Sequence, residues 1–272
     1  MQTSFIKLEN IKLAYYEINS EAQQTLFFIH GNSVSKRNWR KQYNSKVLGG
    51  YRMIAIDLPA HGDSEPLGLP EYSLPLLAKI MCEAVQQLAD DKPYILAGIS
   101  LSTNIVAEML SYDVQPRGLV LAAPCVLGKG HPIEKLAKPY THVSVVFTDE
   151  PDEHDVYSYC SETSLSTEAA DIAIFMEDFK AVKKPFRSAL AHSIASSHYS
   201  DEIALLKEKN TPLLLVFGKE ELVVYTDYLD DAMLPLWNNT IYKMEGASHL
   251  VNIDQPVAFN ELLSEFAQAV FK

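Results

Sequence analysis

A serine at a sharp turn is the first residue of this sequence that could do chemistry. Ser100 lies in the stretch Gly-Ile-Ser-Leu-Ser at residues 98–102, directly after an apolar run at 94–97 and directly before an amphipathic segment at 101–112. A turn between strand and helix lifts a serine hydroxyl above the end of a sheet, and the next backbone amide faces the same space. The pattern alone equally fits a serine-rich turn that caps a helix.

A serine nucleophile requires a base, and the base requires a carboxylate that orients it. His249 lies in a loop after a predicted strand at residues 240–244 and before the last predicted helix. Two adjacent carboxylates, Glu220 and Glu221, directly follow another predicted strand. Because the carboxyl ends of parallel strands meet at one edge of a sheet, we expect Ser100, His249 and one of these glutamates to lie there together.

Short apolar runs separated by amphipathic segments must position these residues. Continuous apolar runs are typical of strands that helices cover on both faces, and they occur at residues 26–29, 53–56, 94–97, 119–123 and 213–217. Residues 5–9 and 11–18 predict an antiparallel pair that opens the sheet. Strands that alternate with helices in this way predict an α/β fold with a mostly parallel, doubly wound central sheet flanked by helices.

The last amphipathic segment is the clearest predicted helix. Asp254 is placed to cap its N-terminus, Pro256 falls in its first turn, and apolar residues from Phe259 to Val270 line one face. A second clear amphipathic segment covers residues 74–89.

The alternation of strands and helices breaks between residues 125 and 207. This stretch contains four prolines, an acidic loop and helix-like pieces at 168–183 and 187–196. It is too long for a plain connection, because structureless loops beyond about 15 residues are rare in compact domains. We interpret residues 125–207 as a mainly helical cap inserted in a core formed by residues 1–124 and 208–272.

Charge and composition exclude several classes of partner. The chain carries 23 basic and 35 acidic residues, a net charge of −12, so nucleic acid and anionic membranes are not expected as partners. Three scattered cysteines argue against a disulfide framework or a zinc site. The N-terminus resembles no secretory signal and no apolar run reaches the about 18 residues of a membrane span, so we expect a cytoplasmic protein.

Five motifs together resemble the α/β-hydrolase superfamily over nearly the whole chain except the cap. They are His-Gly-Asn at residues 30–32, Asp-x-x-Ala-x-Gly-x-Ser at 57–64, the serine turn at 98–102, Gly-x-x-Glu at 218–221 and Gly-x-x-His at 246–249. Their order along the chain, serine then acid then histidine, is that of the family. The resemblance therefore implies an α/β-hydrolase fold with a helical cap and a serine esterase-like site.

Three positions depart from the family pattern. Ser102 and Ala60 stand where glycine is usual, and both are small enough for a crowded turn. Glu221 stands where aspartate is commoner, although some triads of the family use glutamate. The spacing Gly-x-x-acid favours Glu221 over Glu220 as the member of the triad.

The resemblance implies acyl transfer to water, with neither a cofactor nor a metal ion. Ser100 would attack a carbonyl carbon, and His249 would take the serine proton and later return it to the leaving group. Glu221 would fix the imidazole tautomer. The backbone amides of Leu101 and Asn32 would hold the developing oxyanion.

Other polar residues are interpreted as structural. His30, Asp57 and His61 are expected to hold the loops after the third and fourth strands. The histidines of the cap show no metal-ligand spacing.

The serine narrows the function within the family. Haloalkane dehalogenases and epoxide hydrolases of this family use aspartate at the position of Ser100, which excludes them. Hydrolysis of a small carboxylic ester is the predicted activity, with a small-molecule ester or related acyl compound as the partner. Carbon–carbon bond hydrolysis of diketone acids, lactone or thioester hydrolysis and acyl transfer to another acceptor remain as alternatives on the same triad. A ligand receptor with this fold is the alternative from a different class.

Overall fold

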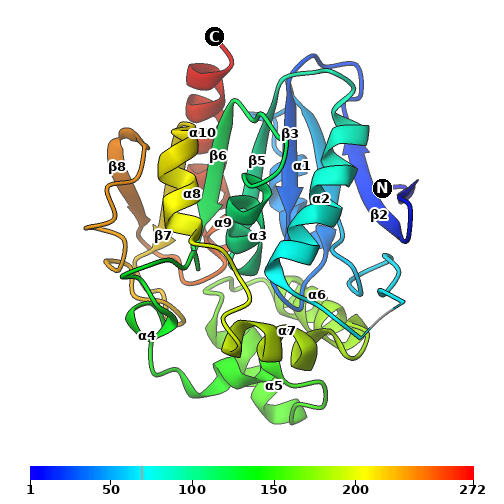
Figure 1. The fold of residues 1–272 in the computed structure, drawn as a ribbon, viewed down its shortest axis with the longest axis vertical. Helices are drawn as coiled ribbons and strands as arrows, with labels where there is room; N and C mark the ends of the chain where they lie inside the picture. The colour runs from blue at the N-terminus through cyan, green and yellow to red at the C-terminus, as the bar shows by residue number, and fades with distance from the viewer. Residues whose placement is uncertain (69) are drawn as a thin grey trace.

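An eight-stranded sheet forms the centre of the molecule (Figure 1). The computed structural model describes residues 1–68 and 70–272. In space the strands follow the order β1-β2-β4-β3-β5-β6-β7-β8. Their bounds are β1 (Ser4–Lys7), β2 (Lys12–Ile18), β3 (Thr25–Ile29), β4 (Arg52–Ile56), β5 (Tyr94–Ile99), β6 (Gly118–Ala122), β7 (Leu213–Gly218) and β8 (Leu236–Met244).

The directions of the strands bring the candidate residues to one edge. β2 pairs antiparallel with β1 and with β4, and the other described pairings of the sheet are parallel. The loops that follow β3, β5, β7 and β8 therefore leave the sheet at the same edge. The predicted α/β fold with a mostly parallel sheet is confirmed, and so is the antiparallel pair that opens it.

Helices cover both faces of this sheet. Their bounds are η1 (Lys36–Trp39, a 3-10 helix), α1 (Arg40–Tyr43), α2 (Leu74–Ala89), α3 (Leu101–Met109), α4 (Ile133–Leu136), η2 (Thr141–Phe147, also 3-10), α5 (Glu153–Glu162), α6 (Ala169–Ala181), α7 (Phe186–Ala195), α8 (Glu202–Lys209), α9 (Val251–Asp254) and α10 (Pro256–Val270). α2, α3 and α8 pack on one face, and η1, α1, α9 and α10 pack on the other (Figure 1).

The central strands are apolar on both sides because both faces are covered. In β3, Phe27 and Ile29 join the core beneath α2 and α3, whereas Leu26 and Phe28 join the core beneath η1 and α10. All four side chains are fully buried. Trp39 of η1 stacks on Phe28 with 4.7 Å between the ring centroids. Two apolar layers thus hold the sheet rigid beneath the loops at its carboxyl edge.

The predicted cap range contains α4, η2, α5, α6 and α7, and of these α5, α6 and α7 lie together beyond one end of the sheet (Figure 1). α8, which begins inside the predicted cap range, packs against α3 of the sheet layer. There the side-chain amide of Asn104 donates to the carboxyl group of Glu202 at 2.8 Å. The division into a core of residues 1–124 and 208–272 and a cap of residues 125–207 stays a prediction.

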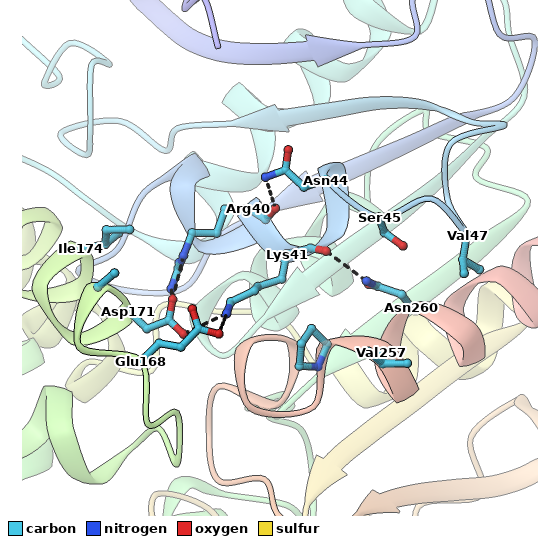
Figure 2. A pocket seen from close by; sticks show the side chains of 12 residues that line it. Arg40, Lys41, Asn44, Ser45, Val47, Glu168, Asp171, Ile174, Val257 and Asn260 are labelled. Carbon is cyan, nitrogen blue, oxygen red and sulfur yellow. Dashed lines mark hydrogen bonds and ion pairs between the residues drawn. The ribbon is translucent and has the colours of Figure 1, made fainter.

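A row of ion pairs, which we call the cap–core seam, joins α6 and the turn before it to η1 and α1. The pairs join Arg37 to Asp178, Arg40 to Asp171 and Lys41 to Glu168. Figure 2 shows the groove of about 530 Å³ beside this seam. Its opposite charges already pair with one another, and it contains neither Ser100 nor His249. This groove therefore lies at a junction between the predicted cap and the predicted core, away from the candidate catalytic residues.

The prediction that Asp254 caps the last helix is wrong. α10 begins at Pro256, and Asp254 is the last residue of α9. Its carboxylate accepts hydrogen bonds from the Ser248 amide at 2.8 Å and from the Ser164 hydroxyl at 2.6 Å. Asp254 therefore fastens the loop that carries His249 to a segment of the predicted cap.

Cys82, Cys125 and Cys160 are free thiols. Within the two described ranges, no helix combines the length and the apolar composition that crossing a membrane requires.

Candidate active site

The turn at Ser100 has the backbone of a nucleophile elbow. Ser100 lies between β5 and α3 with φ 54° and ψ −126°, a conformation that costs energy for any residue with a side chain. A Cβ atom at Gly98 would lie 2.7 Å from the carbonyl oxygen of Ser102, so strand and helix leave no room for a side chain there. The predicted turn between strand and helix is confirmed, and β5 and α3 together hold the serine at the carboxyl edge of the sheet.

Ser102 does more than fit the turn. Its hydroxyl oxygen accepts a hydrogen bond from the Ile99 amide at 2.7 Å, and the hydroxyl donates to the Ile29 carbonyl oxygen at 2.6 Å. The side chain is fully buried. A glycine would leave these two backbone groups without this partner, so the serine links the elbow to β3.

Three side chains from three loops form a hydrogen-bonded chain. Ser100 Oγ lies 2.8 Å from His249 Nε2, and His249 Nδ1 lies 2.9 Å and 3.0 Å from the two carboxylate oxygens of Glu221. Because a carboxylate only accepts, Nδ1 carries the hydrogen and Nε2 is free to accept from the serine. The side chains of His249 and Glu221 are 2% and 0% exposed, so water competes little for these bonds.

The two candidate acids occupy different places. Glu221 faces His249, and its Oε1 also accepts from the Val223 amide at 2.7 Å. Glu220 is exposed, and its carboxylate accepts from the Ala247 amide at 3.1 Å. Glu221 is thus the carboxylate that touches the imidazole, whereas Glu220 supports the histidine loop from outside.

Gly218 allows the acid loop and the histidine loop to touch. A Cβ atom at this position would lie 2.1 Å from the carbonyl oxygen of Ala247 and 2.3 Å from that of Ser248. Only glycine fits a contact this close. The glycine of the Gly-x-x-acid motif therefore has a packing role that does not involve a special backbone angle.

The amides of Leu101 and Asn32 lie on the two loops beside Ser100. Leu101 is the first residue of α3, where backbone amides are unpaired and the helix dipole is positive. Asn32 follows β3, and a Cβ atom at the preceding Gly31 would lie only 3.1 Å from Ser100 Cβ. Among the residues that the structure describes, neither amide has a protein acceptor. Both residues line one cavity with Ser100, so both amides are available to a bound oxygen.

That cavity has a volume of about 130 Å³. The predicted core and the predicted cap both contribute apolar walls, which include Leu74, Leu127, Ile133, Leu136, Val143, Val146, Phe147, Ile194, Val223 and Val224. Ligand pockets for drug-sized molecules span about 300–1,000 Å³. The cavity above Ser100 therefore suits a small apolar group.

Sequence reasoning missed Asn104 and Cys125 in the wall of this cavity. Asn104 lies in the first turn of α3, the helix that directly follows Ser100, so its side chain reaches the same cavity. Cys125 follows β6, the strand beside β5 in the sheet. Burial raises the pKa of its thiol to about 12, so it remains a neutral thiol at neutral pH.

The histidines after β3 and β4 hold loops. His30 Nε2 accepts from the Leu58 amide at 2.9 Å, and burial lowers the pKa of His30 to about 3. His61 Nδ1 donates to the Pro59 carbonyl oxygen at 2.9 Å, and burial lowers the pKa of His61 well below its usual value. Both rings are neutral donors and acceptors, as the sequence interpretation expected of structural residues.

Asp57 has a partner that sequence reasoning missed. Its carboxylate pairs with the ammonium of Lys36 at 2.6 Å, and both side chains are almost completely buried. Across the described residues, histidine, cysteine and carboxylate side chains form no cluster of three that could hold a metal ion.

The sequence model of the Alpha/beta hydrolase family matches residues 26–262 of this chain. The chain belongs to the Alpha/beta hydrolase family. The resemblance inferred from the motifs is therefore confirmed, and the protein is a hydrolase.

Curated relatives match over nearly the full chain. Uncharacterized hydrolase YugF of Bacillus subtilis is 24% identical over 95% of this chain and 95% of its own. A 2-hydroxy-6-oxononadienedioate/2-hydroxy-6-oxononatrienedioate hydrolase of Paraburkholderia phymatum is 20% identical over 93% of this chain and 90% of its own.

Solved structures share the whole fold. The N-acyl homoserine lactonase AidH, complexed with N-butanoyl homoserine, is 25% identical, covers 100% of this chain and 98% of its own, and superposes with a TM-score of 0.88. A thermophilic esterase from Thermogutta terrifontis is 15% identical over 100% of both chains, with a TM-score of 0.78. At 15% identity, the similarity to the esterase supports the shared fold alone.

Proposed function

We propose that this protein is a serine hydrolase that cleaves a small carboxylic ester through an acyl-enzyme intermediate. The observation that best supports this proposal is the continuous chain of hydrogen bonds from Glu221 through His249 to Ser100. Ser100, at the end of this chain, lines an apolar cavity. A serine with a neutral imidazole behind it is a nucleophile toward carbonyl carbon.

In the first step, Ser100 Oγ attacks the ester carbonyl carbon and its proton passes to His249 Nε2. The carbonyl π electrons move to oxygen, and the backbone amides of Leu101 and Asn32 donate to that oxyanion. Glu221 stabilises the imidazolium that forms, because it accepts the Nδ1 hydrogen in a buried environment. Collapse of this tetrahedral species breaks the bond to the alkoxide, which leaves as the alcohol with the proton from Nε2.

In the second step, water takes the place of the alcohol. His249 Nε2 removes one water proton, the hydroxide oxygen attacks the acyl carbon, and the same two amides hold the new oxyanion. Breakdown returns the proton to Ser100 and releases the carboxylic acid. Each half of the reaction thus uses the same contacts in the same geometry.

The cavity supports a preference for a short acyl group. Its volume of about 130 Å³ is small, and its walls are mostly apolar side chains. The lining residues include no lysine or arginine, within the part of the chain that the structure describes. A diketone acid would bring a carboxylate into these walls without a cation to pair it, so carbon–carbon bond hydrolysis is less well supported than ester hydrolysis.

A lactone is the second candidate substrate, because it is a cyclic ester and needs no other residues. The observation that favours it is the likeness to the lactonase AidH over the whole chain at 25% identity. Opening the ring would leave the alcohol attached to the acyl group as one product.

Hydrolysis of p-nitrophenyl esters from acetate to decanoate tests the proposed function. We expect turnover to be highest for acetate and butyrate and to fall for longer chains, because the closed cavity is small. Ser100→Ala should reduce kcat by at least about 10⁴-fold, since the nucleophile is gone. Ser111→Ala is the matched control and should keep normal activity, because Ser111 lies just past the C-terminal end of α3, the helix that follows Ser100. A Ser100→Ala protein with normal turnover would refute the assignment.

A further inference from the structure

The side chain of Asn32 is held by the predicted cap. Its amide nitrogen donates to the carbonyl oxygen of Val146 in η2 at 2.8 Å. Its amide oxygen accepts from the hydroxyl of Ser33 at 2.9 Å. Asn32 carries one of the two backbone amides beside Ser100, so these contacts bear on the geometry of the oxyanion site.

Ser33 is in turn held by a buried arginine of the cap. Arg187 lies in α7, is 4% exposed, and donates from Nε to the Ser33 hydroxyl oxygen at 2.9 Å. Its Nη2 donates to the carbonyl oxygen of Phe179, and the guanidinium lies 4.0 Å from the centre of the Phe179 ring. Hydrogen bonds therefore run without a gap from Arg187 through Ser33 to Asn32. We call these three residues the relay.

The positive charge of Arg187 persists in this position. Burial lowers the pKa of Arg187 to about 10, which leaves the group protonated at neutral pH. Its hydrogen-bond partners in Ser33 and Phe179 are neutral oxygens, and the negative charge of Asp149 favours the protonated form. A cation in a poorly hydrated region acts on nearby charges more strongly than one in water.

The backbone of Ser33 also depends on its surroundings. Its φ is 61°, in the left-handed region that favours glycine. Its amide donates to His61 Nε2 at 3.2 Å. A conformation of this kind persists only where contacts enforce it. The peptide unit between Asn32 and Ser33 carries the Asn32 carbonyl, and the Asn32 amide lies in the preceding peptide unit. Release of Ser33 would free the backbone angles of Asn32 between these two units, and through them the Asn32 amide would turn.

We propose that Arg187 and Ser33 are positioning residues that aim the Asn32 amide at the oxyanion, so that the cap completes the oxyanion hole. This inference rests on the proposed function. Hydrogen bonds to the oxyanion strengthen as charge develops, and a donor fixed in advance needs no reorganisation at that moment. Loss of the relay should therefore reduce kcat while substrate binding changes little.

Three variants test the relay with p-nitrophenyl butyrate. Complete loss of one oxyanion donor costs about 10²–10³-fold in kcat, and a misaimed donor should cost about tenfold or more. We expect that loss for Ser33→Ala and for Arg187→Met, with KM within about twofold. Arg187→Lys keeps the positive charge but loses the planar guanidinium with its several N–H donors. The kcat of Arg187→Lys should therefore lie between that of Arg187→Met and that of the wild type. Lys183→Met removes another cap cation that bonds to a core carbonyl, that of Ser64, and should keep normal kcat.

A second readout does not depend on turnover. n-Butylboronic acid forms a tetrahedral adduct with a reactive serine and places an oxygen where the oxyanion would lie. Its affinity should fall in Ser33→Ala by the same factor as kcat/KM, whereas the affinity for the product butyrate should stay the same. In an Asn32→Ala background, Ser33→Ala should add less than about twofold, because both changes break one chain of contacts.

The outcomes separate this inference from the proposed function. Wild-type protein that neither cleaves esters nor binds the boronic acid would refute the proposed function. Wild-type protein that does either, combined with a normal Ser33→Ala variant, would refute the relay alone. Additive effects of Asn32→Ala and Ser33→Ala would also refute it. Should Arg187→Met fail to fold, Ser33→Ala decides, because it removes a single hydroxyl.

Discussion

Glutamine at position 221 tests the proposed acid, because it keeps the shape of the side chain and removes its charge. The carboxylate of Glu221 receives three donors from the protein, the Nδ1 hydrogen of His249 and the amides of Val223 and Val224. Glutamine has a single acceptor oxygen and an NH₂ group that can only donate. After the substitution, its NH₂ group must therefore face at least one of these donors.

Both orientations of the glutamine reduce the rate. If its oxygen stays on Val223, the NH₂ group faces Nδ1 and forces the imidazole hydrogen onto Nε2, where it blocks acceptance of the Ser100 proton. A wrong tautomer of this kind costs about 10⁴-fold, or about 5 kcal/mol. If the oxygen turns to His249, the Val223 and Val224 amides lose their acceptor at a cost of about 1–3 kcal/mol, which is about 5–150-fold when that state alone is active. We expect kcat on p-nitrophenyl butyrate to fall by between about 5-fold and about 10⁴-fold.

Glu220→Gln is the matched control, since the same chemical change is made one residue away on an exposed side chain. Glutamine can still accept from the Ala247 amide, so kcat should stay within about threefold of wild type. Steady-state kinetics at one pH, on proteins with equal melting temperatures, make the comparison. If Glu221→Gln stays within threefold, or if Glu220→Gln proves the more damaging change, the assignment of the acid is wrong.

Two further predictions concern stability. His30 and His61 are neutral in the folded protein but take up protons when it unfolds below pH 6.5, their usual pKa. The free energy of unfolding should therefore fall as the pH drops from about 6.5 toward 3, by up to about 1.4 kcal/mol per pH unit for each histidine. Urea titrations across this range measure the change. A free energy of unfolding that does not vary with pH would contradict the reasoning. Ser102→Gly should reduce the free energy of unfolding by about 1–3 kcal/mol, because the buried Ile99 amide loses its acceptor; an unchanged urea midpoint would contradict this.

The sheet and the three loops of the proposed triad could be predicted because they depend on local signals. Buried parallel strands need apolar side chains on both faces, and parallel strands end at one edge. Those two rules place Ser100, Glu221 and His249 together without any knowledge of the cap. The choice between Glu220 and Glu221 needed the spacing from Gly218, which the close contact of the two loops explains.

Contacts between segments far apart in the chain could not be predicted from the sequence. Nothing near Asn32 indicates that Val146, 114 residues later, accepts from its side chain. Asp254 has the residue type and place of a helix cap, yet a tertiary contact with Ser248 and Ser164 overrides that local preference. Lys36 likewise looks like a surface lysine in the sequence and is buried against Asp57.

The cap–core seam should limit the exchange of the predicted cap of this chain for a foreign one. Basic groups lie on the core side of the seam and acidic groups on the cap side, and several of them are partly buried. A foreign cap without acidic groups at the positions of Asp171 and Asp178 would leave Arg37 and Arg40 unpaired next to an apolar surface. A chimaera that replaces the predicted cap would then need matched changes in η1 and α1, because those short helices carry the basic partners of the ion pairs.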